Sequence, residues 1–170
     1  TKGGLYIGTG IERNLSHIIA SDYDLGVIID NNASVPEIIL PILGLFLMQS
    51  KNRAGFMSLL CCKEIPPDYF ENRPIPPDKM EHDFKEIPFN QRIFDEQLGL
   101  IRELIVSHID GASQEWAMRI AKNFLNRVHE FGFYFKEGVP SRWYSLFGRR
   151  GWLENEDNMQ IIKSKWEGTK

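Results

Sequence analysis

Two short apolar runs near the N-terminus constrain the fold more than any other feature of the chain. Leu5–Ile7 leads into Gly8-Thr-Gly10, and Val27–Ile29 ends in Asp30. Short apolar or β-branched runs bounded by Gly, Asn or Asp are typical of strands, and the residues between these two runs suit a short helix. The pattern predicts a strand–helix–strand unit of the α/β class, with the glycines and the aspartate at the carboxyl edge of a parallel sheet.

The carboxyl edge of a parallel sheet is where α/β folds of this kind bind nucleotides. A glycine loop lets the backbone approach the ligand, and an acidic side chain on the neighbouring strand accepts hydrogen bonds from ribose hydroxyls. The nucleotide-binding pattern Gly-x-Gly-x-x-Gly has three glycines. Only two are present here, because Asn14 or Leu15 stands where the third is expected. An ordinary unit, in which Gly8 and Gly10 make a turn and Asp30 caps the next helix, is therefore an open alternative.

The composition fits one globular domain over residues 1–170, with 42% hydrophobic and 25% charged residues. Because the net charge is -3, we expect no general nucleic-acid binding. Cys61 and Cys62 are adjacent in an apolar stretch with no nearby histidine, so we interpret them as reduced packing residues and expect no metal site. Reduced thiols favour a cytoplasmic location, with a secreted bacterial effector as the alternative.

The longest apolar run spans residues 35–48 and predicts a buried helix. It contains Pro36, Glu37 and Pro41, and it is shorter than the roughly 20 residues needed to cross a bilayer. We therefore expect no contact with a membrane. The N-terminal Thr1-Lys-Gly-Gly4 has neither an initiator methionine nor a signal-peptide pattern, and we expect it to be a cut end.

Most of the chain after Asp30 is predicted to be helical. The periodicity of apolar residues predicts helices over 35–49, 53–62, 91–108 and 113–131, and a last helix from about residue 155. A Pro-rich excursion at 65–90 interrupts them, because six of the nine prolines lie in it. We expect this excursion to be extended, and either functional or loosely ordered.

Several short motifs occur along the chain in an order found in one protein family. They are Tyr6-Ile-Gly-Thr-Gly10, Asn14-x-Ser16, Gly26-Val-Ile-Ile-Asp30, Ser50-Lys-Asn-Arg53-Ala-Gly-Phe56 and the closing stretch 151–163. In these motifs the chain resembles a family of poorly characterised bacterial proteins with a class I, S-adenosylmethionine-dependent methyltransferase-like fold. The resemblance brackets most of the chain, while the Pro-rich excursion matches poorly.

The resemblance implies a Rossmann-like, methyltransferase-type domain that is helix-rich after its first two strands and takes S-adenosylmethionine as its cofactor. Gly8 and Gly10 would lie in the cofactor loop, and Asp30 would lie at the ribose-binding position. Asn14 and Arg53 match family positions of unassigned role. We group Asn14 with the cofactor-binding residues, and Arg53 with the weaker candidates for binding a substrate or a partner.

The sheet of such a domain has more strands than the two predicted here. In the family the sheet continues after the last helix, whereas this chain ends at Lys170. The resemblance therefore implies an incomplete domain, whose sheet is completed by a second chain or by a C-terminal fragment. The alternative is that the resemblance describes only a subdomain.

Candidates for catalysis are few. His17 lies just behind the glycine loop, and a surface or packed histidine is the alternative. His82 and Glu86 share one face if their segment is helical, and that spacing can support acid/base or nucleotidyl-transfer chemistry. Arg149 and Arg150 lie between glycines, where two guanidinium groups can bind a phosphate or a carboxylate of a substrate or partner. For this pair, a solvated basic turn is the alternative.

These observations leave three functional hypotheses. The first is a nucleoside-cofactor-binding, methyltransferase-like domain whose catalytic activity is open. The second is a noncatalytic protein-interaction domain on the same scaffold, which binds a protein partner through the Pro-rich excursion and the Arg149–Arg150 loop. The third is a nucleotidyl transferase in which His82 and Glu86 supply the chemistry.

Overall fold

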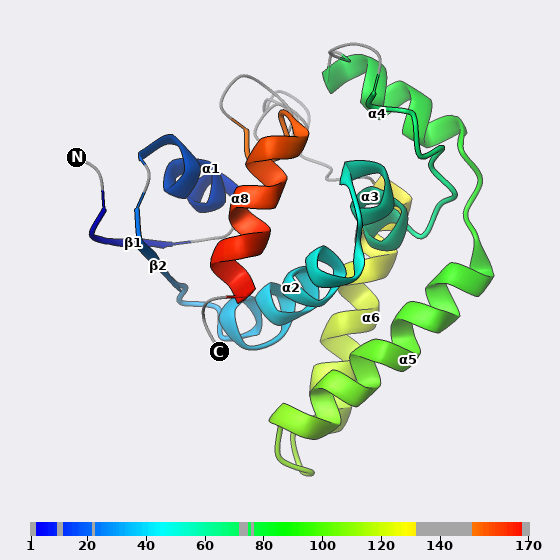
Figure 1. Cartoon of the computed structure of the whole chain (residues 1–170). Helices are drawn as coiled ribbons and strands as arrows, with labels where there is room; N and C mark the ends of the chain where they lie inside the picture. Colours follow the sequence, from blue (N-terminus) through cyan, green and yellow to red (C-terminus); the bar gives the residue numbers. More distant parts are fainter. Residues whose placement is uncertain are drawn as a thin grey trace.

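Helices make up most of the described chain, and two short strands lie at one end of the molecule (Figure 1). The computed structural model describes residues 3–9, 12–21, 23–71, 75, 77–131 and 151–167. The elements are β1 (Leu5–Thr9), α1 (Glu12–Ser21), β2 (Leu25–Ile29), η1 (Val35–Ile39), α2 (Leu40–Gln49), α3 (Arg53–Cys61), α4 (Pro77–Glu86), α5 (Gln91–His108), α6 (Gln114–Phe131) and α8 (Glu156–Glu167). The fold is therefore a helix-rich α/β arrangement, as the sequence predicts in general terms.

β1 and β2 form a two-stranded parallel sheet, which confirms the predicted strand–helix–strand unit. The register is continuous and ends with Thr9 paired with Ile29. α1 connects the two strands and covers one face of the sheet, with Leu15 and Ile18 buried. Gly26 leaves the space that Ile18 fills, because a Cβ at Gly26 would come closer than 3.0 Å to the Ile18 side chain.

Residues 35–49 form one apolar helical stretch, as predicted. It begins with the π-helical turn η1 and continues as α2, with Pro41 in the first turn of α2. Pro41 has no N–H to donate, and it lies where the π-helical turn passes into α2. Ile42 and Phe46 are fully buried, so the stretch is a core helix. Among the described residues, no helix is both long enough and apolar enough to span a membrane.

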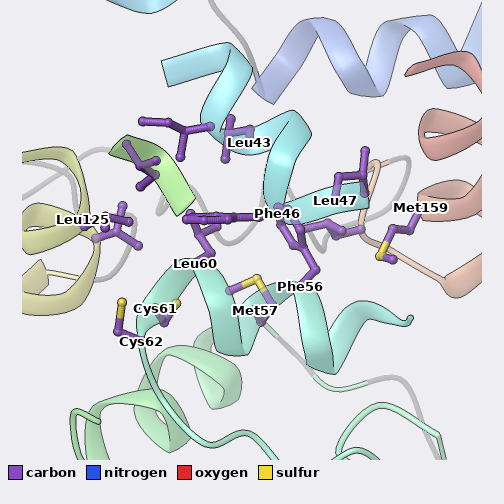
Figure 2. Packing of buried hydrophobic residues seen from close by; sticks show 14 of the residues in the cluster. Leu43, Phe46, Leu47, Phe56, Met57, Leu60, Cys61, Cys62, Leu125 and Met159 are labelled. Atoms are coloured by element: carbon purple, nitrogen blue, oxygen red, sulfur yellow. The ribbon is translucent and has the colours of Figure 1, made fainter. Parts of the chain in front are cut away.

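The hydrophobic core lies where α2, α3, α6 and α8 meet (Figure 2). Its fully buried side chains include Phe46 from α2, Phe56 and Leu60 from α3, and Leu125 from α6. Met159 of α8 lies at one side of this cluster (Figure 2). Because α8 packs against both α1 and α2, the last helix of the chain joins the strand end of the molecule to its helical body.

The Pro-rich excursion at 65–90 differs from the extended segment expected, because it contains α4 and returns to its starting point. Lys63 and Phe89 form an isolated antiparallel bridge at its base. Beside this bridge, the Asn90 N–H donates to the Cys62 carbonyl at 2.8 Å. The excursion is therefore a closed loop that carries a helix.

An aromatic cluster gives the excursion its own small core. The rings of Tyr69, Phe70 and Phe84 contact one another, with centroid separations of 4.9, 5.4 and 6.5 Å. Phe70 and Phe84 are buried, and the Tyr69 hydroxyl donates to the Asp83 carboxylate at 2.7 Å. Tyr69 and Phe70 precede the central prolines of the excursion and Phe84 follows them. No regular spacing of apolar residues in the sequence therefore predicts this cluster.

Candidate functional site

The carboxyl ends of β1 and β2 meet at one edge of the sheet. Thr9 and Ile29 are paired in register, so Asp30 follows β2 beside the end of β1. α1 begins at Glu12, shortly after β1 ends. Gly10 lies outside the described residues. The structure therefore brings Asp30 to the edge where the sequence predicts a ligand, next to the strand that leads into the glycine loop.

Gly8 lies within β1, and not in the loop that the resemblance implies. A Cβ at this position would come closer than 3.0 Å to the Asn14 side chain and to the Tyr6 hydroxyl. The missing side chain therefore makes room for packing between the strand and α1. Gly8 is thus a residue of the strand that leads into the loop, and its contact with a cofactor stays a prediction.

The Asn14 side chain is buried and hydrogen-bonded within the strand–helix–strand unit. Its Nδ2 donates to the Thr9 carbonyl, and its Oδ1 accepts from the Tyr6 hydroxyl. Asn14 thus fastens α1 to the end of β1 and positions the edge of the sheet. Tyr6 was not a candidate from the sequence. Its inward position in β1, two residues before Gly8, is the signal that could have identified it.

Asp30 is half-buried and stabilises the turn after β2. Its Oδ1 accepts from the Asn32 N–H at 2.9 Å, and the Asn32 side chain in turn accepts from the Ser34 N–H at 3.2 Å. The N-cap residue of η1 is Ser34, so Asp30 stabilises the turn before that helix and is not the helix cap that the sequence left open. A carboxylate has about four acceptor positions, so the turn bond is compatible with further bonds to a ligand.

Arg53, at the start of α3, binds the protein's own backbone. Its guanidinium donates to the carbonyls of Leu153 at 3.1 Å and Glu154 at 2.9 Å, and it lies 4.7 Å from the centroid of the Phe70 ring. Its backbone N–H donates to the Glu156 carboxylate at 3.1 Å. Burial lowers the pKa of Arg53, and Glu156 opposes that shift. Arg53 therefore joins α3, the excursion and the segment leading into α8.

The candidates for catalysis do not gather at the sheet edge. His17 is exposed on α1, with its ring centroid 6.1 Å from that of Tyr6. His82 and Glu86 are exposed on α4, four residues apart, so the predicted shared helix face is present. However, α4 lies far from β1 and β2 (Figure 1). His82 and Glu86 are therefore a separate pair and do not belong to the site that includes Asp30.

Arg149 and Arg150 lie outside the described residues, so their binding of a phosphate or carboxylate stays a prediction. Within the described part of the chain, no group of three His, Cys, Asp or Glu side chains could hold a metal ion.

Lys63 is a buried charged residue that the sequence did not single out. Its Nζ donates to the Phe84 carbonyl and, at 2.7 Å, to the Ile87 carbonyl, both near the end of α4. A cation is favoured at a helix C-terminus, where carbonyl groups lack partners. Burial lowers the pKa of Lys63, and the neighbouring Cys61 opposes that shift. A lone lysine directly after an apolar run is the sequence signal that could have marked it.

Comparisons of this chain with protein-family models, with curated proteins and with solved structures found no match. The likeness to methyltransferase-like proteins therefore remains an interpretation of short motifs.

Proposed function

We propose that the β1–α1–β2 unit binds a nucleoside cofactor of the S-adenosylmethionine class, within a Rossmann-like, methyltransferase-type domain. The supporting observation is the register that pairs Thr9 with Ile29 and sets Asp30 beside the end of β1. Ligands of parallel α/β sheets bind at this edge. In the proposal, Asp30 accepts hydrogen bonds from ribose hydroxyls, and Gly10 lets the backbone approach the cofactor.

The residues at the edge divide into those that fit a ligand contact and those that fit a supporting role. Asp30 is half-buried and has acceptor capacity beyond its turn bond. Gly8 and Asn14 are packed against each other, so in the proposal they shape the end of β1 that faces the cofactor. S-adenosylmethionine supplies an electrophilic methyl group when bound. In the proposal, the residues of this chain bind the cofactor and orient its methyl group.

Cellular location and partners belong to the same proposal. Cys61 and Cys62 are free and buried, which suits a reducing cytoplasm. A two-stranded parallel sheet is smaller than the sheets that carry nucleoside sites in known folds. We therefore include in the proposal a second chain or a further fragment that supplies the rest of the sheet.

Calorimetric titration with S-adenosylmethionine, its demethylated product, ATP and NAD tests the proposal. We expect saturable binding of the first two, weakened about tenfold or more in Asp30→Ala, because a charge-assisted bond to the ribose is lost. Asp30→Asn keeps an acceptor for the Asn32 N–H, so it separates loss of charge from loss of the turn. Asp24→Ala is the matched control, because Asp24 accepts from the Gly4 N–H at 2.8 Å at the opposite edge of the sheet.

Two results would contradict this proposal. One is a folded, intact gene product that binds none of the four ligands, and the other is equal weakening in Asp24→Ala and Asp30→Ala. ATP-selective binding that depends on His82 would instead favour the nucleotidyl-transferase hypothesis, for which α4 supplies the shared face with Glu86.

A further inference from the structure

Residues 66–69 form a turn on the Pro-rich excursion, with the sequence Pro-Pro-Asp-Tyr. The first three of them are exposed to solvent. The residues on either side of the turn, Ile65 and Phe70, are buried. The Ile65 N–H also donates to the Ser58 hydroxyl of α3 at 3.1 Å, which fixes the upstream end of the turn to the helical body. Two adjacent prolines are therefore presented to solvent between two anchored ends.

The backbone of this turn is restricted to the conformations that proline-recognition domains bind. Proline fixes φ at about −65°, and a residue that precedes a proline favours the extended or polyproline II region. Both effects apply here, because Ile65 and Pro66 each precede a proline. The Tyr69 N–H donates to the Pro66 carbonyl at 3.0 Å, so the tyrosine follows the two prolines in a fixed position. A partner that binds this segment therefore removes little backbone freedom.

Tyr69 is the member of the aromatic cluster that the excursion can release. Phe70 and Phe84 are buried, whereas Tyr69 is half-buried. The rings of Phe70 and Phe84 contact each other directly, at a centroid separation of 6.5 Å, so this contact does not depend on Tyr69. The Tyr69 hydroxyl donates to the Asp83 carboxylate at 2.7 Å, and Lys79 donates to both oxygens of that carboxylate at 2.9 and 2.8 Å. Asp83 therefore keeps a charged partner when Tyr69 turns outward.

We propose that the turn at 66–69 binds a WW-type domain of a partner protein, a small domain with an aromatic-lined groove for proline-rich segments. In the complex the two prolines lie in the groove, and the Tyr69 ring leaves Asp83 and packs beside them with its hydroxyl at the rim. The contacts of Tyr69 within the excursion compete with the partner, so they lower the affinity. The proposal is independent of nucleoside binding, because α4 and the excursion that carries it lie far from β1 and β2 (Figure 1).

Fluorescence anisotropy tests this proposal with the full chain and a labelled WW-type domain that binds Pro-Pro-x-Tyr segments. We expect saturable binding, weakened about tenfold or more in Tyr69→Ala and in the double variant Pro66→Ala/Pro67→Ala, because each removes a group that fills the partner's groove. Asp83→Ala removes the acceptor that holds Tyr69 in the excursion. We therefore expect Asp83→Ala to bind about threefold more tightly than the unmodified protein, whereas Asp83→Asn keeps an acceptor and should bind as the unmodified protein does.

Pro88→Ala and Asp95→Ala are the matched controls, and neither should change binding. Pro88 is an exposed proline of the same excursion outside the turn. Asp95 is an exposed carboxylate on α5 that accepts from Gln91 at 2.9 Å. Unchanged binding by a folded Tyr69→Ala variant, no gain in Asp83→Ala, or equal binding of a domain that takes Pro-x-x-Pro segments would overturn the proposal. If thermal unfolding shows that Tyr69→Ala does not fold, the double proline variant decides.

Discussion

Two glycines inside helices have opposite surroundings and therefore opposite expected effects. A Cβ at Gly44 of α2 would come closer than 3.0 Å to the Trp166 ring of α8, whereas at Gly99 of α5 no atom beyond the neighbouring helix backbone lies within 4 Å of a Cβ. Overpacking costs about 1–3 kcal/mol and exceeds the gain of about 1 kcal/mol from replacing a helical glycine by alanine. We expect Gly44→Ala to destabilise the protein, and Gly99→Ala to stabilise it by about 0.5–1 kcal/mol.

Urea unfolding of the two glycine variants and the unmodified protein measures both effects. The two substitutions add the same methyl group, so each variant is the control of the other. If Gly44→Ala were as stable as Gly99→Ala, the close approach of α2 and α8 at Trp166 would be wrong.

For a buried polar side chain, the sequence shows which donor or acceptor groups it has, but not which groups they bind. Asn14 and Arg53 are candidates because they match motifs of the family that the chain resembles, but their partners come from other parts of the fold. Asn14 binds the end of β1, and Arg53 binds the carbonyls of Leu153 and Glu154. A donor's type is a property of the residue, whereas its acceptor depends on tertiary packing.

At the scale of elements, a single lysine fastens α4 to the helical body. Lys63 donates from the base of the excursion to the carbonyls of Phe84 and Ile87. Lys63→Met keeps the aliphatic stem but leaves both carbonyls without this donor, which costs about 1–3 kcal/mol. Removal of a buried charge, whose cost is indicated by the lowered pKa of Lys63, offsets part of this loss. We expect a net local destabilisation of the excursion.

Hydrogen exchange measured by mass spectrometry locates the effect of Lys63→Met. Amides of α4 should exchange several-fold faster, while those of α5 keep their protection. Lys79→Met is the control, because Lys79 is exposed on α4 itself and pairs with Asp83 at 2.8 Å. An exposed pair of this kind contributes less than about 1 kcal/mol. Similar exchange in both variants would show that Lys63 does not fasten α4.

At the scale of the whole molecule, the two buried thiols make folding sensitive to alkaline pH. Cys61 and Cys62 are free and buried, as predicted, and burial raises the pKa of each from 9.0 to about 12. The folded state therefore holds these protons more tightly than the unfolded state. Stability from this source is fully present below pH 9 and is lost as the pH rises toward 12. At about pH 10 the loss reaches up to about 1.4 kcal/mol per thiol.

Urea unfolding at a series of pH values, with reductant present, tests this dependence. The double variant Cys61→Ala/Cys62→Ala should lose less stability between pH 8 and about pH 10.5 than the unmodified protein, although it starts from a lower value because its core has lost two sulfur atoms. Other groups that ionise in this range are the same in both proteins. Parallel pH profiles would contradict the assignment to the thiols.

The candidate site was predictable in position but not in detail. The apolar runs and Asp30 placed it at one sheet edge, because strands and their order are local properties of the sequence. The role of Gly8 was not predictable. Its space is filled by Asn14 and Tyr6, and only the packing of α1 on β1 reveals that. The Pro-rich excursion was mispredicted for a similar reason, since Phe70 and Phe84 meet across the prolines.

The sequence by itself determined the two strands, their order along the chain and the helices other than α4. For example, α5 has the predicted bounds Gln91–His108, and the Asn90 side chain caps it by accepting from the Ile93 N–H. These features depend on residues a few positions apart. Only the tertiary structure decided which buried polar groups become partners and which sheet face stays exposed. Those outcomes depend on contacts such as that of Arg53 with Leu153, whose residues are brought together only when the core forms.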